Sequence, residues 1–307
     1  MSYKTKLIAL STLVAALAVV YTLTFVFDPQ RRHDRAFAWL EPRLHALADR
    51  IEISGPAGDT VLIRRNDIWF LNTAWGEYPV RQQRVQDLFA VLSRRDMYTL
   101  RSTSLEARES LGLSVGSASR IIVRGGIGLP LLDLLIGIGG ALGMEVYLAR
   151  ADEREIYSGD DRFTVFTDSG PMFWLDLRLF GDQPRAAAMV QQAEVNSAQG
   201  SYILRRSGGG WELQGDESAD LVGSRVEAWL RAVLEAEGED FSAQAPPAIE
   251  GSITLWFGDG TVRIIQIGPP EDEENHRRAA VSGLPLVYVL SGWTVDRLFR
   301  ESSDFIR

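Results

Sequence analysis

The sequence predicts an α+β protein in which an N-terminal transmembrane helix precedes two tandem repeats, each an antiparallel sheet with one main covering helix. Three observations support this prediction: an uncharged apolar run near the N-terminus, a long-range internal repeat, and β-rich runs followed by a helical period in each copy. The predicted parts are an N-terminal membrane anchor (residues 1–28), a juxtamembrane helical segment (29–50), a first module (51–182), a linker (183–200) and a second module (201–307).

The apolar run begins at Leu7, ends at Phe27 and contains no charged side chain. As a helix it would be roughly 32 Å long at about 1.5 Å per residue, which matches a hydrocarbon core of about 30 Å. Its large aliphatic and aromatic side chains together favour insertion by roughly 4 to 7 kcal/mol. The lipid bilayer is therefore a predicted partner, contacted through the residues from Leu7 to Phe27.

A cleaved secretory signal is the alternative interpretation of this run, because Lys4 and Lys6 precede it and Ala16-Leu17-Ala18 fits a small-x-small cleavage pattern. Cleavage there would leave a strongly apolar stub, so an uncleaved signal anchor is the better fit. Arginines also follow the run, so the positive-inside rule does not decide the orientation. A short N-terminus before a large domain is typical of a single-pass protein of the cytoplasmic membrane whose bulk is extracytoplasmic.

Composition excludes several functional classes. A formal net charge of −9 argues against nucleic acid and anionic lipid surfaces as partners, since both need a basic face. The absence of cysteine excludes disulfides, thiolate metal sites and cysteine nucleophiles.

An internal repeat organises the rest of the chain. An aliphatic residue followed by two arginines occurs twice, as Ile63-Arg64-Arg65 and as Leu204-Arg205-Arg206. Each arginine pair is followed by a tryptophan, Trp69 in the first copy and Trp211 in the second. The two tryptophans are separated by one residue more than the two arginine pairs are. This difference predicts that the turns between arginines and tryptophan differ in length. Short β-rich runs flank each turn, so both copies open with strand, turn and strand.

A helical period follows in both copies, with the same separation as the arginine pairs. Its apolar positions fit the i, i+3, i+4, i+7 spacing of an amphipathic helix. They are Val85, Leu88, Phe89 and Leu92 in the first copy, and Val226, Trp229, Leu230 and Val233 in the second. Most of the eight tryptophans lie in such runs, which favours core packing over carbohydrate binding; Trp75, in a polar loop, is the exception.

The second halves of the copies also correspond. Residues 121–137 and 253–268 are each two apolar runs around a glycine turn, which predicts a hairpin. Residues 145–158 then match 278–291, so that Ser158-Gly159 aligns with Ser291-Gly292. Each copy closes on an aromatic segment that predicts a short helix, residues 171–180 and 293–299.

One motif suggests catalysis. Residues 112–116 match G-x-S-x-G, the nucleophile elbow of α/β hydrolases, with Ser114 at its centre. That elbow follows a strand and opens a helix, whereas here a helical pattern precedes the motif and a strand pattern follows it. An envelope serine hydrolase using Ser114 is therefore an alternative and not the main prediction.

Other candidate sites fail on spacing, so no catalytic, cofactor-binding or metal residue is predicted. The glycines at 137, 139, 140 and 143 do not fit G-x-G-x-x-G and favour a turn between strands. The three histidines, His33, His45 and His276, lack zinc spacing, and the acidic run 271–274 lacks the calcium-loop pattern. Asp216, Glu217 and Asp220 are expected to be turn and cap residues.

Several weak motifs occur in a recognisable order. They are Ala38-Trp39-Leu40-Glu41-Pro42, Ile51-Glu52-Ile53, the Arg-Arg and Trp strands, Tyr78-Pro79-Val80, Leu111-Gly112-Leu113, and residues 158–163. In this order they resemble the family described as domain of unknown function 4340, membrane-anchored proteins often encoded beside gliding-motility-type ABC transporters. The family's usual proline after the Leu-Gly-Leu element is missing here.

The resemblance implies a single-pass protein with an extracytoplasmic α+β domain beside a transporter, and it supplies no catalytic residues. The expected function is that of a non-enzymatic accessory or scaffold protein of the cell envelope. Its expected membrane-protein partner is an ABC transporter subunit. A ligand-binding sensor is the other alternative, for which a pocket is the discriminating feature.

Overall fold

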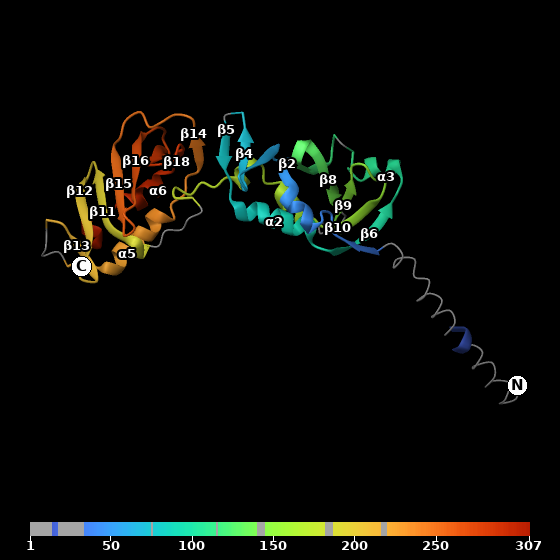
Figure 1. Cartoon of the computed structure of the whole chain (residues 1–307), viewed down its shortest axis with the longest axis horizontal. Helices are drawn as coiled ribbons and strands as arrows, with labels where there is room; N and C mark the ends of the chain where they lie inside the picture. The colour runs from blue at the N-terminus through green and yellow to red at the C-terminus, as the bar shows by residue number, and fades with distance from the viewer. Residues whose placement is uncertain are drawn as a thin grey trace. The chain divides into compact units, whose positions relative to one another are not determined.

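A computed structural model of the chain describes residues 14–17, 34–74, 76–114, 116–139, 145–181, 187–215 and 220–307 (Figure 1). The chain divides into two compact units, Met1–Trp174 (unit 1) and Leu175–Arg307 (unit 2). Most of the predicted anchor lies outside the described residues; Val14 to Leu17 are described and are helical. Within the described residues, no helix is both long enough and apolar enough to cross a membrane.

Unit 1 contains one antiparallel sheet, sheet 1. Its described strands are β1 (Asp34–Phe37), β2 (Ala48–Ser54), β3 (Thr60–Arg65), β4 (Ile68–Thr73), β5 (Gly76–Pro79), β6 (Asp96–Ser102), β7 (Ser119–Gly125), β8 (Leu129–Gly139), β9 (Glu145–Arg150) and β10 (Ile156–Asp160). They lie in the order β1-β6-β10-β9-β8-β7-β2-β3-β4-β5. The helices are α2 (Gln82–Ser93), α3 (Leu105–Ser110) and α4 (Thr164–Thr167), with 3-10 helices η1 (Pro42–Leu47), η2 (Gly126–Gly128), η3 (Asp161–Phe163) and η4 (Pro171–Trp174).

Unit 2 contains a second antiparallel sheet, sheet 2. Its described strands are β11 (Val190–Ser197), β12 (Gly200–Ser207), β13 (Gly210–Leu213), β14 (Asp240–Ser242), β15 (Gly251–Phe257), β16 (Val262–Pro270), β17 (Arg277–Val281) and β18 (Val287–Leu290). They lie in the order β13-β12-β11-β15-β16-β17-β18-β14. The helices are α5 (Gly223–Leu234) and α6 (Gly292–Leu298), with 3-10 helices η5 (Ala187–Met189) and η6 (Ser302–Phe305).

The two sheets repeat one strand order. With β1 and β5 set aside, sheet 1 read from its β4 side has the order β4-β3-β2-β7-β8-β9-β10-β6. Sheet 2 has the order β13-β12-β11-β15-β16-β17-β18-β14, which is the same arrangement of strands in chain order. The long helix follows the third strand of this set in both units. The predicted α+β class with two antiparallel sheets is confirmed, and β1 and β5 are additional edge strands of sheet 1.

The predicted covering helices are present with the expected buried positions. In α2 the buried residues are Val85, Leu88, Phe89 and Leu92, and in α5 they are Val226, Trp229, Leu230, Val233 and Leu234. These side chains pack on sheets whose strands alternate between buried and accessible residues. In β2, for example, Ile51 and Ile53 are buried and Glu52 between them is half-buried. Each fully buried aliphatic side chain contributes about 1.5 to 3 kcal/mol before entropy is subtracted.

The strand register corrects the alignment of the two arginine pairs. Arg64 lies opposite Trp69 in β3 and β4, and Arg206 lies opposite Trp211 in β12 and β13. Arg64 is therefore equivalent to Arg206, and the arginines have the same separation along the chain as the tryptophans. The expected difference in turn length is wrong, because burial sets the register: Leu62 and Leu204 are both fully buried.

The two hairpin turns share a left-handed backbone. In unit 1, Asn66 and Asp67 have φ of 49° and 66°, and in unit 2, Gly208 and Gly209 have φ of 56° and 90°. A two-residue turn with positive φ at both positions matches the twist of a hairpin and favours asparagine, aspartate and glycine. Asp67 is thus equivalent to Gly209.

The closing elements are also shifted from their expected pairing. Tyr157 lies opposite Leu148, and Tyr288 lies opposite Ala279. Leu148 and Ala279 hold the same register position in their sheets, so the two tyrosines are equivalent. Three residues after each tyrosine, an N-cap side chain accepts a backbone hydrogen bond at the start of a helical segment, Asp160 in unit 1 and Ser291 in unit 2. The equivalent of Ser291 is therefore Asp160 and not Ser158.

Three predicted segments differ from the structure. The juxtamembrane segment (29–50) is not one helix: its described part contains β1, which pairs with β6, then the proline-initiated η1 and the start of β2. The linker (183–200) contains β11, which pairs with both β12 and β15 because Val190, Ala193 and Val195 are buried. The unit boundary falls after Trp174 and not after residue 182, so residues 171–180 are divided between the units and only η4 is helical.

Packing of the long helix on its sheet predicts a large mutational effect in unit 1. Leu88 has no exposed surface, so Leu88→Ala should lower the free energy of unfolding by about 2 to 5 kcal/mol through lost burial and a residual cavity. The matched control is Leu105→Ala, at a side chain that is 65% exposed, which should change it by no more than about 0.5 kcal/mol. Urea denaturation measures both values, and equal effects would contradict the helix placement.

Candidate functional site

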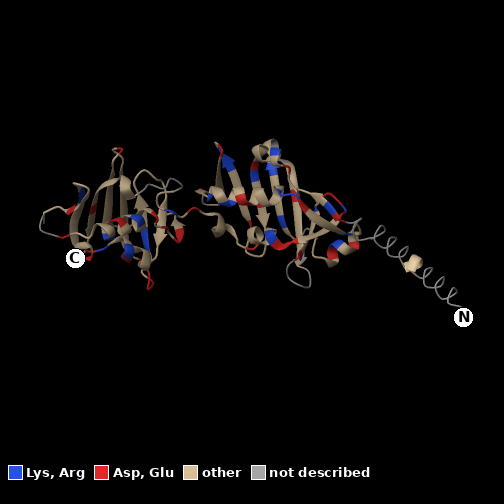
Figure 2. Ribbon diagram, turned by 90° about the horizontal axis from the view of Figure 1, so that it is seen from below, with Lys and Arg blue, Asp and Glu red and all other residues tan. Residues whose placement is uncertain are grey.

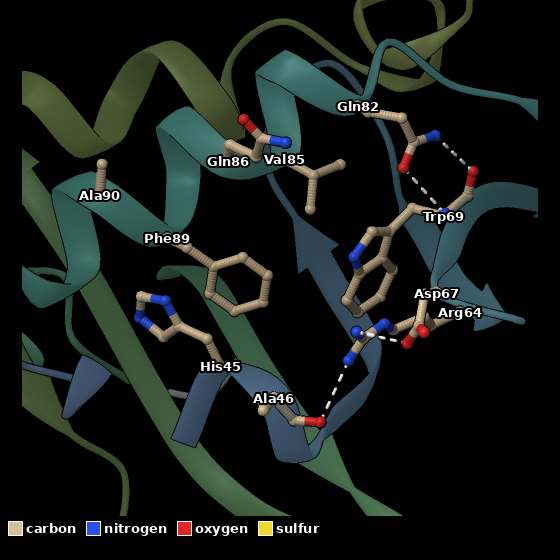
Figure 3. A pocket seen from close by; sticks show the side chains of 10 residues that line it. All are labelled: His45, Ala46, Arg64, Asp67, Trp69, Gln82, Val85, Gln86, Phe89 and Ala90. Carbon is tan, nitrogen blue, oxygen red and sulfur yellow. Dashed lines mark hydrogen bonds and ion pairs between the residues drawn. The ribbon is translucent and has the colours of Figure 1, made fainter. Parts of the chain in front are cut away.

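A cavity of about 410 Å³ opens between helix α2 and the β3–β4 hairpin of unit 1 (Figure 3). Its lining combines aromatic rings with polar groups that come from three separate elements. The residues used below are His45, Arg64, Asp67, Trp69, Gln82, Gln86 and Phe89. A concave aromatic surface with a few directed polar groups is the usual form of a small binding site.

Three rings form the apolar part of the cavity. The ring centroids of Trp69 and Phe89 are 5.9 Å apart, and those of His45 and Phe89 are 4.6 Å apart. His45 Nε2 shares a hydrogen bond with the hydroxyl of Ser93 at the end of α2. Burial lowers the pKa of His45, so its imidazole is neutral at neutral pH and adds no charge to the cavity.

Arg64 carries the positive charge of the cavity. Its Nη1 donates to the carbonyl oxygens of Ala46, at 3.1 Å, and Ala48, at 3.3 Å, and its Nη2 donates to Asp67 Oδ1 at 2.7 Å. Its Nε is buried and has no hydrogen-bond partner within the described part of the chain. The Asp67 side chain is 89% exposed, which makes the ion pair weak and easily exchanged.

Gln82 fixes the helix against the hairpin. Its Nε2 donates to the carbonyl oxygen of Trp69 at 3.0 Å, and its Oε1 accepts from the backbone N–H of Trp69 at 2.9 Å (Figure 3). The side chain thus mimics a strand residue and satisfies the backbone of β4. The same Nε2 also donates to the carbonyl oxygen of Val80 at 2.9 Å. The width of the cavity at Trp69 therefore depends on the first turn of α2.

The equivalent place in unit 2 holds a carboxylate of the protein itself. Glu227 Oε1 accepts from Arg206 Nη2 at 2.6 Å and from Trp211 Nε1 at 3.0 Å. The guanidinium carbon of Arg206 lies 4.5 Å from the Trp211 ring centroid. Burial raises the pKa of the Glu227 carboxyl, but the hydrogen bonds from Trp211 and Arg206 outweigh it and hold the pKa below its ordinary value.

The second face of sheet 1 carries an ionic network. Figure 2 shows basic and acidic residues distributed along the strands of unit 1. Glu52 accepts from Arg50 at 2.6 Å and from Arg124 at 3.2 Å, and Arg120 forms a bidentate pair with Asp133 at 2.6 and 2.8 Å. Burial raises the pKa of Glu52, and the hydrogen bonds from Arg124 and Arg50 reverse the effect, so that the net shift is downward. These groups pair with one another across the sheet, so the network is a structural feature of this face and not a charged site for a ligand.

Ser114 does not acquire the partners of a nucleophile. It lies in an exposed bend between α3 and β7, and its hydroxyl shares a hydrogen bond with Ser117 Oγ at 2.6 Å. The helix before it and the strand after it are in the order expected from the sequence. The hydrogen-bond partner of Ser114 is therefore another hydroxyl, whereas a catalytic serine needs a general base within hydrogen-bond distance of its own hydroxyl.

The remaining sequence candidates have structural roles where the structure describes them. Gly137 lies in β8, where an added Cβ would come within 2.2 Å of the carbonyl oxygen of Leu111, and Gly139 ends that strand. Asp220 pairs with Arg307 at 3.4 Å. The glycines at 140 and 143, His33, Trp75, Asp216 and Glu217 lie outside the described residues.

The acidic run 271–274 is organised by His276. The His276 Nδ1 lies 2.7 Å from Asp272 Oδ2, and its Nε2 lies 3.0 Å from Glu239 Oε2. The hydrogen bonds to Asp272 and then Glu239 raise the pKa of His276. Among the described residues, no group of three acidic or histidine side chains is arranged to hold a metal ion.

Comparison of this chain with family models, curated proteins and solved structures finds no match. The resemblance to membrane-anchored proteins beside ABC transporters therefore stays a prediction from the order of motifs in the sequence. The cavity of unit 1 and its filled counterpart in unit 2 are features that sequence reasoning missed. The signal was present in the repeat, since Gln86 and Glu227 each directly follow the first buried valine of their helix, Val85 or Val226.

The Glu227 contacts predict a stability effect with a defined pH dependence. Glu227→Gln should lower the free energy of unfolding by about 1 kcal/mol at pH 7, after discounting for partial exposure. Because the folded pKa lies below the ordinary 4.5, this stabilisation is present above pH 4.5 and is lost as the pH falls through the folded value. Thermal unfolding of both proteins from pH 7 to acid should show the difference vanish. Glu212→Gln, at an exposed position of β13, is the control, and a pH-independent difference would contradict the assignment.

His276 predicts the opposite pH dependence. Its folded pKa is raised above the ordinary 6.5, so its stabilisation is complete below pH 6.5 and is lost as the pH rises through the folded value. Unit 2 should therefore lose stability on the alkaline side of pH 6.5. His276→Ala should be less stable than the wild type at pH 6, and the difference should shrink towards alkaline pH. Parallel pH profiles of the two proteins would show that the ring is not bonded to Asp272 and Glu239.

Proposed function

We propose that this chain is a non-enzymatic accessory protein of the cell envelope, anchored in the cytoplasmic membrane and binding a membrane-protein partner through its extracytoplasmic units. The partner proposed is a subunit of an ABC-type transporter. The uncharged run from Leu7 to Phe27 supports the anchor, and the order of motifs in the sequence supports the class of partner. The chemistry of the described candidates supports binding over catalysis, since Ser114 has a hydroxyl and not a base as its partner.

The observation that carries the proposal is the second face of sheet 2. Helices α5 and α6 pack with the inner-face residues of this sheet in one core. On the opposite face the side chains of Trp256 and Ile264 are half-buried, and Val262 is 38% exposed. Their equivalents on sheet 1 belong to the ionic network, Arg124 for Trp256 and Asp133 for Ile264. The two copies therefore present different surfaces, and the apolar side chains on this face of unit 2 suit a protein partner.

Affinity purification tests the partner. The full-length chain, purified from membranes in mild detergent after crosslinking, should bring down a transporter subunit. Trp256→Glu should abolish this recovery, because a charge placed at the centre of an apolar contact is costly to desolvate. Leu105→Ala, at an exposed position of unit 1, is the control and should leave recovery unchanged. Recovery of the protein alone under these conditions would contradict the proposal.

Protease accessibility tests the orientation. Protease added to intact cells with a permeabilised outer layer should digest both units, because the bulk of the chain is proposed to be extracytoplasmic. A fragment containing the run from Leu7 to Phe27 should remain with the membrane fraction. An undigested chain in cells whose known periplasmic markers are cleaved would place the units in the cytoplasm.

A further inference from the structure

We propose that the cavity of unit 1 is a receptor for a carboxylate, namely the side chain of an acidic residue in a partner polypeptide. In this assignment the ligand takes the place that Glu227 occupies in unit 2. The inference goes beyond the accessory function and does not depend on the identity of any transporter. It rests on the comparison of one fold with its second copy in the same chain.

Three positions define the receptor in both units. The strand register makes Arg64 equivalent to Arg206 and Trp69 equivalent to Trp211, and each arginine lies opposite its tryptophan. The helices place Gln86 at the position of Glu227. In unit 2 the guanidinium and the indole N–H converge on one carboxylate oxygen, at 2.6 Å and 3.0 Å.

Unit 1 keeps the two donors but lacks the carboxylate from the helix. Gln86 lines the cavity, and its side chain makes no hydrogen bond to another described residue. Trp69 Nε1 likewise has no acceptor among the described residues, and Figure 3 shows it on the ring edge that faces Phe89 across the cavity. The buried Nε of Arg64 is also without an acceptor in the described part of the chain. Within the residues that the structure describes, the buried Nε of Arg64 and the indole N–H of the cavity-lining Trp69 are donors without acceptors, and such donors favour a ligand that accepts hydrogen bonds.

Asp67 is the competing carboxylate and has to be displaced. It stands where unit 2 has Gly209, and it reaches Arg64 Nη2 from the hairpin turn at 2.7 Å. Its side chain is 89% exposed, so solvent screens the pair and makes it weak. It also leaves the indole N–H of Trp69 unpaired among the described residues, so it does not reproduce the arrangement around Glu227. A ligand carboxylate that bonds both donors would replace it.

The shape of the cavity favours an acidic side chain over a small free anion. A volume of about 410 Å³ is much larger than one carboxylate. The rings of Trp69, Phe89 and His45 provide an apolar surface for the methylene stem and the adjoining backbone of a peptide. Because His45 is neutral, Arg64 and Asp67 carry the only charges among the described residues that line the cavity.

Fluorine NMR tests the proposal on the full-length chain in detergent, labelled with 5-fluorotryptophan. The signal of Trp69, assigned by Trp69→Phe, should shift on titration with N-acetyl-glutamate N-methylamide, with a Kd of about 1 to 10 mM. The corresponding glutamine derivative should leave it unshifted, and the Trp211 signal should not move with either probe. N-acetylglycine presents a chain-end carboxylate, and binding equal to the glutamate probe would overturn the side-chain assignment.

Two variants sharpen the test without removing a donor. Gln86→Glu supplies the carboxylate internally, so it should abolish probe binding and move the Trp69 signal towards its bound position. Asp67→Gly copies Gly209 and removes the competitor, at a positive φ of 66° that glycine readily adopts, so it should tighten probe binding roughly two- to five-fold. A Trp69 signal unmoved by the glutamate probe, or probe binding unchanged in Gln86→Glu, would overturn the proposal. Neither result bears on the transporter partner.

Discussion

The packing of one twelve-residue helix on one face of each sheet is the constraint on which the rest of the structure depends. Helix α2 must bring Leu88 and Leu92 onto strands whose inner residues, such as Ile51, are fully buried, and helix α5 does the same in unit 2. A shift of one residue in any strand would turn its apolar side chains to the other face. This requirement fixes the strand register, and the register places an arginine opposite a tryptophan at the edge of each helix.

Outside that constraint the two copies are free to differ, and their differences are where function is expected. Gln86 and Asp67 in unit 1 stand where unit 2 has Glu227 and Gly209. The exchange keeps one carboxylate beside each arginine but moves it from the helix to an exposed turn, which opens a cavity over Trp69. The second faces differ in a similar way, since an ionic network on sheet 1 corresponds to half-buried apolar side chains on sheet 2. Duplication of a stable core therefore allows one copy to change its surface while the fold is maintained.

The sequence was informative where burial has a regular period and less so where it does not. The spacing of Val85, Leu88, Phe89 and Leu92 predicted a helix because only a 3.6-residue period buries all four. Strand β11 was missed because the alanines and glutamines around Val190 and Val195 conceal an alternating pattern. The separation of the two long helices pairs Arg65 with Arg206, whereas the strand register pairs Arg64 with Arg206, so an alignment based on the helices places the arginines one residue out. The cavity could not be predicted, because it depends on a cross-strand pairing that no local pattern specifies.

The measurement that tests the duplicated fold most directly is disulfide formation between cysteines introduced into the cysteine-free chain. Glu52 lies opposite Ile122 on sheet 1, and Glu194 lies opposite Thr254 on sheet 2, at equivalent places of β2–β7 and β11–β15. Facing residues of an antiparallel pair bring their Cβ atoms within about 5.5 Å, close enough for a disulfide after small adjustment. The account predicts that both double-cysteine variants crosslink under mild oxidation, whereas cysteines at 52 and 123, on opposite faces, do not. Crosslinking of the shifted pair, or of only one of the two equivalent pairs, would contradict it.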